Sequence, residues 1–170
     1  MTRTLAALGL AAALVLTGCA AQPAADGLTL LQTKSPVQLM RNEAADRLDP
    51  AVFDVVRKST DTSFPCVTED GNDGGIVRQW KSSTDLALVE GADENAAAEA
   101  IVESFVTQGW AAEKLEEAGV DLTELSKAES IAVIRVAAAD ESTSALVRIT
   151  ALGPCVVTGG PDSDEVVNLG

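Results

Sequence analysis

Residues 131–152 read IAVIRVAAADESTSALVRITAL, two apolar stretches with a polar stretch between them. Apolar runs rich in β-branched residues and separated by turn-forming residues are typical of a β-hairpin. We therefore predict strands at 131–137 and 145–152. Val133 and Arg135 alternate with Ile134 and Val136, so one face of the hairpin can be buried while the other faces water. The C-terminal part of the chain is expected to form an antiparallel sheet.

A helix is predicted upstream of this hairpin, between Asp93 and Gly109. Asp93 is a good N-cap residue, and glycine is common at the C-terminal end of a helix. The residues between them form a stripe at helical spacing, which consists of Ala97, Ile101, Phe105 and Gln108 and is widened by Val102 and Val106.

The segment 111–118, AAEKLEEA, has two interpretations. Its helix propensity is high, and Gly119 would end a second helix. We expect a break at Gly109 followed by a short second helical segment. A strand that begins at Trp110 is the alternative.

The first helix of the domain is predicted to begin at Ser35. Residues 35–38, SPVQ, combine an N-cap serine, a proline at the first helical position and a glutamine at the third, which is the pattern of a capping box. Asp49 and Pro50 offer a second cap before the apolar residues at 52–56. The segment is therefore expected to form one kinked helix or two consecutive helices that end before residue 60.

The segment between the two helical regions is expected to contain strand. Residues 69–75, EDGNDGG, have turn chemistry and are predicted to form a loop. Residues 76–80 and 85–89 then form one long strand or two paired short strands.

The N-terminus is predicted to be a signal peptide. It contains Arg3 and then a short apolar stretch, whereas a membrane-spanning helix needs about 20 apolar residues. The stretch ends in Leu16-Thr17-Gly18-Cys19, which resembles the lipobox of bacterial lipoproteins. The resemblance implies that Cys19 carries a diacylglyceryl group, and two acyl chains make a stable anchor. An ordinary secretory peptide, cut after Ala20 or Ala21, is the alternative.

Cys66 and Cys155 remain once Cys19 is assigned to lipid. Each has a preceding proline and a following valine. An even pair of cysteines in an exported protein is expected to form a disulfide, because the compartment outside the cytoplasm is oxidising.

Together these observations predict a two-layer α+β fold with helices packed on one face of a small antiparallel sheet and one disulfide. The expected organisation is a lipoprotein signal peptide at 1–18, a flexible tether at 19–34, an α+β domain at 35–158 and an acidic C-terminal tail at 159–170.

Composition excludes several classes of function. The chain has 170 residues, a formal net charge of −14 and no histidine. The acidity opposes nucleic-acid binding, and the absence of histidine excludes His-based triads and His-ligated zinc. The acidic residues at 70–75 have the wrong spacing for an EF-hand. The loop of an EF-hand needs a glutamate at position 12, and position 12 counted from Asp70 is Lys81. No cofactor, metal site or catalytic residue is predicted.

The five aromatic residues are expected in the core, with partial exposure of Trp80 or Trp110 at a binding surface as the alternative. The order of elements resembles small lipoproteins of high-GC Gram-positive bacteria, many of which have no assigned activity. We expect a membrane-anchored extracytoplasmic lipoprotein that acts as a non-enzymatic interaction module of the cell envelope. A carrier of a lipid or small apolar ligand, held in a cavity between helices and sheet, is the alternative, and an enzyme is a third, weaker hypothesis.

Overall fold

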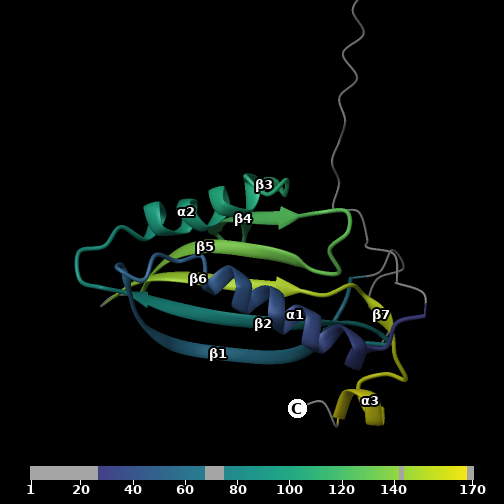
Figure 1. Ribbon diagram of the computed structural model, residues 1–170. Coiled ribbons are helices and arrows are strands. Elements are labelled where there is room, and N and C mark those ends of the chain that lie inside the picture. Colours follow the sequence, from purple (N-terminus) through teal and green to yellow (C-terminus); the bar gives the residue numbers. More distant parts are fainter. Residues whose placement is uncertain (1–26, 68–74, 142–143, 168–170) are drawn as a thin grey trace, which may run out of the picture.

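The structure, a computed structural model, describes residues 27–67, 75–141 and 144–167 (Figure 1). It contains helices and strands in mixed order. The helices are α1 (Leu30–Ala45), α2 (Glu94–Val106) and α3 (Asp164–Val167). The strands are β1 (Phe53–Pro65), β2 (Val77–Leu88), β3 (Ala111–Glu117), β4 (Val120–Ser126), β5 (Val133–Glu141), β6 (Ser144–Leu152) and β7 (Val156–Val157).

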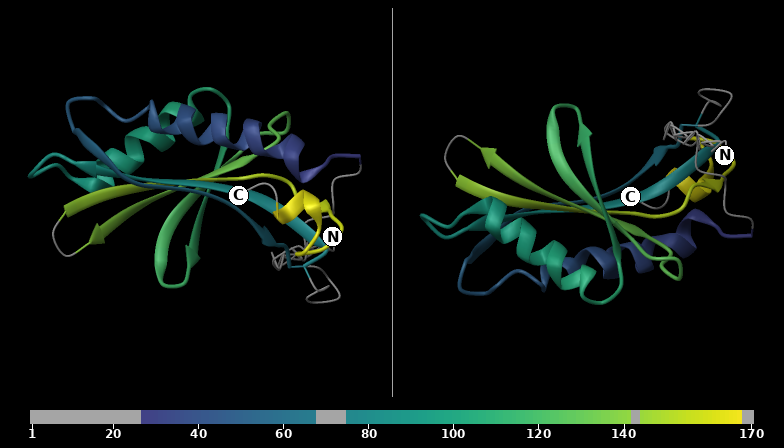
Figure 2. Two further views of the ribbon diagram at one scale, coloured as in Figure 1. Left: turned by 90° about the horizontal axis from the view of Figure 1, so that it is seen from below. Right: turned by 90° about the horizontal axis from the view of Figure 1, so that it is seen from above.

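The strands form one sheet in the order β1-β2-β6-β5-β4-β3, with β7 paired to β2. Every pairing is antiparallel. The helices α1 and α2 lie on the same face of this sheet (Figure 2). The predicted two-layer α+β fold is confirmed.

The hairpin predicted from residues 131–152 forms, although its first strand runs from Val133 to Glu141 and not from 131 to 137. Strands β5 and β6 pair from Val133↔Leu152 to Glu141↔Ser144 and lie in the middle of the sheet. Helix α2 also forms as predicted. The Asp93 carboxylate accepts hydrogen bonds from the backbone N–H groups of Asn95 and Ala96. Ile101 and Phe105 are fully buried against the sheet.

The core lies between the helices and the sheet in two clusters. The larger cluster packs α2 against β2, β4, β5 and β6 and includes Phe105, Ile134 and Ile149. The smaller cluster packs α1 against β2 and includes Val37 and Trp80. The face of the sheet opposite to the helices carries no helix among the described residues (Figure 2).

The predicted start of the first helix at Ser35 is wrong. Helix α1 begins at Leu30, and its capping box is formed by Thr29 and Gln32. The Thr29 N–H donates to Gln32 Oε1 (2.8 Å), and the Gln32 N–H donates to Thr29 Oγ1 (3.3 Å). Pro36 lies inside the helix and weakens its hydrogen bonding there. Burial of Leu30, which precedes it in the helix, and of Val37, which follows it, stabilises this part of the helix. Residues 30–34, expected in the tether, are therefore helical.

This correction leads to a prediction about helix caps. Replacing Thr29 by alanine is expected to lower the free energy of unfolding by about 1 kcal/mol, because it removes the N-cap acceptor. Replacing Ser35, which is exposed within the helix, is expected to cost nothing, because alanine has the higher helix propensity. Urea denaturation of both variants checks this, and a larger loss for Ser35→Ala would contradict the observed cap.

The predicted helix at 52–56 is also wrong. Asp49 caps a turn, in which its carboxylate accepts from the Ala51 N–H (2.8 Å) and its carbonyl accepts from the Val52 N–H (3.0 Å). The chain then enters β1, which pairs with β2 along its whole length, from Phe53↔Leu88 to Pro65↔Arg78. The β-branched residues of this segment favour a strand once a partner is present. For residues 76–89 we predicted either one long strand or two paired short strands. The structure has one long strand there, β2.

The short second helix predicted at 111–118 is wrong, and the alternative of a strand is confirmed. The Trp110 N–H donates to Phe105 O (3.2 Å) across Gly109, whose φ is 84°, so the chain turns out of α2. Strand β3 then pairs with β4, to which we assigned no element. Ala118 and Gly119 form the two-residue turn between them, both with positive φ, as a tight hairpin requires.

The predicted loop at 69–75 lies, except for Gly75, outside the described residues. The expected loose tail from Gly159 is wrong up to Val167. Thr158 Oγ1 accepts from the Gly160 N–H (3.2 Å), Ser163 Oγ donates to Gly160 O (2.8 Å), and Val166 packs on the cluster around Trp80. These contacts hold the segment from Gly159 to Val166 against the domain.

Candidate functional site

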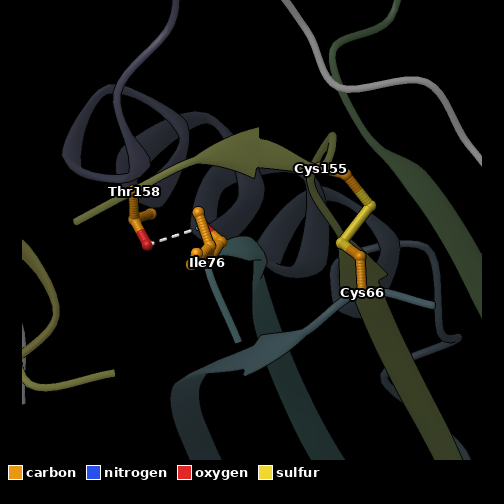
Figure 3. The surroundings of a disulfide bond; sticks show 4 residues. All are labelled: Cys66, Ile76, Cys155 and Thr158. Carbon is orange, nitrogen blue, oxygen red and sulfur yellow. Dashed lines mark hydrogen bonds between the residues drawn. A yellow bond between two sulfur atoms is a disulfide. The ribbon is translucent and has the colours of Figure 1, made fainter. Parts of the chain in front are cut away.

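The predicted disulfide between Cys66 and Cys155 is confirmed. The two Cα atoms are 6.2 Å apart, and both cysteines are buried. Figure 3 shows the disulfide near a hydrogen bond from Thr158 Oγ1 to Ile76 O (2.8 Å). The disulfide ties the segment before β7 to the end of β1, and the hydrogen bond ties the segment after β7 to the start of β2. The other predicted site residue, Cys19, lies outside the described residues.

The two tryptophans do not form a binding surface. Trp80 is 2 % exposed and lies beneath α1, with Lys34 Nζ 4.9 Å from its ring centroid. Trp110 is half-buried and packs edge-on against Phe105, with ring centroids 5.2 Å apart. Both rings belong to the core, as we expected. The same expectation is wrong for Phe53, which is 36 % exposed at the start of β1.

A cleft opens where the sheet divides into two hairpins. Strands β4 and β5 pair only at three positions, from Thr123↔Val136 to Leu125↔Ile134. Beyond Val136, β5 continues to Glu141 in its pairing with β6, while β4 runs towards its turn with β3. Figure 2 shows the β3–β4 hairpin pointing away from the β5–β6 hairpin. Among the described residues, β5 therefore has no ladder partner on its β4 side after Val136.

Helix α2 closes one wall of this cleft, which has a volume of about 890 Å³. We call it the α2–β5 cleft. Its apolar walls come from α2, from β4 and the turn before it, and from β5. They comprise Ala98, Val102, Val106, Val120, Leu122, Val136, Ala137, Ala138 and Ala139. The three consecutive alanines leave the edge of β5 accessible, because their side chains end at Cβ.

The charged residues of the cleft are mainly acidic. Glu99 and Glu103 lie on α2 and Asp121 on β4, whereas the cations are Lys114 on β3 and Arg148 on β6. Arg148 is held on the other side by Asp85, whose carboxylate oxygens accept from Nε (2.7 Å) and Nη2 (2.9 Å). The cleft thus offers an unpaired strand edge, apolar walls and an excess of carboxylates.

The sequence did not predict this cleft. The run Ala137-Ala138-Ala139 was the available signal, because it interrupts a strand that is otherwise β-branched. This run of alanines indicates a cleft only if the neighbouring strand β4 separates from β5 at this point. The sequence of β4 has no strong hydrophobic pattern that would have predicted this strand.

Two further observations concern the chemistry of the described residues. No three of their Cys, Asp or Glu side chains are grouped so that they could hold a metal ion. None of their helices has the length and apolar character needed to cross a membrane.

Comparison with protein-family models, with curated proteins and with solved structures gave no significant match.

Proposed function

We propose that this protein is a lipoprotein, anchored through Cys19 at the extracytoplasmic face of the cell membrane, that acts as a non-enzymatic interaction module of the cell envelope. The lipobox at Leu16–Cys19 supports the anchor. The Cys66–Cys155 disulfide supports export, because such bonds persist in oxidising compartments. The α2–β5 cleft is the proposed interaction site, and its occupant is an extended peptide segment of an envelope protein.

The unpaired edge of β5 carries this proposal. An extended peptide can add to such an edge, with main-chain hydrogen bonds for affinity and side-chain pockets for specificity. Neighbouring strands lie about 4.8 Å apart, so a close approach needs small side chains at the edge. Ala137, Ala138 and Ala139 meet this need, and α2 provides an apolar wall for alternate side chains of the peptide.

The charges of the cleft indicate the kind of peptide. Glu99, Glu103 and Asp121 outnumber the two cations, so a segment with lysine or arginine beside small apolar residues is the best match. The position of the anchor indicates where that segment is. Leu28 follows Cys19 by nine positions, a span of at most about 30 Å even when fully extended. The domain therefore begins close to the membrane surface, and the partner is a protein of the same envelope layer.

Site-specific crosslinking in intact cells tests the cleft. A photoreactive amino acid at position 99, on the cleft side of α2, is expected to crosslink to one segment of one envelope protein. The same amino acid at position 113, an exposed residue of β3 outside the cleft, is the control. A synthetic peptide of the mapped segment should bind the purified protein and lose on the order of tenfold in affinity with Glu99→Arg/Glu103→Arg. The control Glu113→Arg/Glu116→Arg makes the same charge change outside the cleft.

Two results would contradict the peptide proposal. Identical crosslinks from positions 99 and 113 would show that contact is random, and equal peptide affinity for both charge-reversal variants would show that the cleft is not used.

A small apolar ligand is the second candidate for the same cleft. Its volume lies in the range of small-molecule sites, about 300–1,000 Å³, and its walls are mainly apolar. Native mass spectrometry of protein purified from its own membrane separates the candidates. A bound lipid or other small molecule that is lost with Val102→Trp favours the carrier, and a clean protein mass favours the interaction module.

The anchor has its own test. A Cys19→Ala variant is expected to move from the detergent phase to the aqueous phase in phase partitioning, because it lacks the acylated cysteine. The Cys66→Ser/Cys155→Ser variant should remain in the detergent phase and is the control for loss of cysteines that carry no lipid. Equal partitioning of Cys19→Ala and the parent protein would contradict lipidation.

A further inference from the structure

We propose that the face of the sheet opposite to the helices carries a second binding site, for a phosphate group, in a hollow formed by β1, β2 and β6. The hollow has a volume of about 320 Å³. Its β2 residues, Lys81, Ser83 and Asp85, alternate with residues that pack under the helices, such as Trp80 and Leu86. Successive side chains of a strand point to opposite faces, so the hollow lies on the uncovered side.

The register of the three strands brings complementary groups together. Residues from β1, β2 and β6 form two adjacent rows across the sheet. The first row consists of Lys58, Asp85 and Arg148, and the second row consists of Thr60, Ser83 and Thr150. Lys81 lies opposite Thr62 in the next row and also lines the hollow. A row of hydroxyl groups therefore lies between cationic side chains.

The charge of the hollow is positive, although the chain as a whole has a net charge of −14. Three cations and one carboxylate line it. Among the described residues, neither Lys58 nor Lys81 has a carboxylate within 4.0 Å. Arg135 on β5 is a contrast, because Glu117 and Glu124 each accept from its guanidinium at 2.8 Å. Asp85 lies opposite Lys58 in the sheet, but its ion pair is with Arg148, so the two lysines supply positive charge that is not engaged in an ion pair among the described residues.

The hydroxyl groups add directional donors. Ser83 Oγ and Thr150 Oγ1 are 2.7 Å apart, so one hydroxyl donates to the other and the second proton can go to a ligand. A phosphate group has three strong acceptor oxygens, whereas a carboxylate has two. Cationic donors from three strands together with a hydroxyl row match the phosphate better. Its source is a soluble phosphorylated compound or a phospholipid headgroup.

Binding of defined phosphates to the mature, detergent-solubilised protein tests the site. Inorganic phosphate and glycerol 1-phosphate are expected to bind, more weakly as NaCl is raised, because salt screens exposed charges. Lys58→Gln/Lys81→Gln should reduce the affinity on the order of tenfold or more, because it removes two charged donors. Lys34→Gln/Lys127→Gln, with the same charge change at two lysines that line neither the hollow nor the α2–β5 cleft, should alter it less than about twofold. Thermal unfolding verifies that both variants are folded.

The source of the phosphate is resolved with vesicles. Retention of the Cys19→Ala protein on phosphatidylglycerol vesicles but not on phosphatidylcholine vesicles, lost with Lys58→Gln/Lys81→Gln, assigns a lipid headgroup. Binding of glycerol 1-phosphate without vesicle retention assigns a soluble ligand. Failure to bind any of these probes, or equal binding by the two lysine variants, would overturn the proposal. Arg148 lines both the hollow and the α2–β5 cleft, but neither Lys58 nor Lys81 lines the cleft, so the result with the lysine variants does not bear on the proposed peptide site.

Discussion

Replacing both Cys66 and Cys155 by serine is expected to lower the free energy of unfolding by about 4.5 kcal/mol and the melting temperature by about 15 °C. The bond links residues separated by 89 positions, so it removes much of the conformational freedom of the unfolded chain. In the folded protein it fastens the end of β1 to the segment that leads into β7. Thermal unfolding of the two proteins measures the effect.

Reductant provides the control for this prediction. Dithiothreitol should lower the melting temperature of the parent protein to that of Cys66→Ser/Cys155→Ser and should leave the variant unchanged. Melting temperatures within about 2 °C of each other for parent and variant would show that the bond contributes little, since about 1 kcal/mol shifts a domain of this size by several degrees.

Replacing Phe105 by alanine is the second change with a large expected effect, about 4 kcal/mol of unfolding free energy. The Phe105 ring is 0 % exposed, and it packs against Trp110 at an interplanar angle of 81° and beneath Arg47, whose Cζ is 5.6 Å from the ring centroid. Alanine would leave a cavity where α2 ends and would remove the contact that fixes the exit of the chain towards β3. Urea denaturation of the variant measures the loss.

The neighbouring residue is the matched control. Val106 is the last residue of α2 and is 44 % exposed. Val106→Ala is therefore expected to lower the free energy of unfolding by less than about 1 kcal/mol. Similar losses for the two variants would mean that the buried contacts of Phe105 do not set the stability of this region.

The parts of the fold that the sequence predicted are those with strong local signals. Asp93 and Gly109 mark the ends of α2, and the β-branched runs on either side of residue 142 define β5 and β6. The disulfide followed from counting cysteines. In contrast, β3 has the composition of a helix and becomes a strand only because Ala118 and Gly119 turn it back on β4. Pairing with a neighbour overrides propensity there.

The two candidate sites depend on relationships that a single sequence does not contain. The α2–β5 cleft arises because β4 leaves β5 after three pairs, and the phosphate hollow arises from the register of β1, β2 and β6. Lys58 and Arg148 are 90 positions apart in the chain and share a row only because both lie opposite Asp85. Residue types alone gave no reason to group them.

The topology of β2 also sets the order in which the protein is able to fold. Strand β2 is hydrogen-bonded to β6, and Lys81 meets Leu152, near the end of the described chain. A nascent chain that has emerged only as far as α2 can form the β1–β2 hairpin but has no strand to cover the inner edge of β2. Assembly of the central sheet therefore waits until the chain has been delivered at least as far as Leu152, and long-range pairing of this kind makes this step slow.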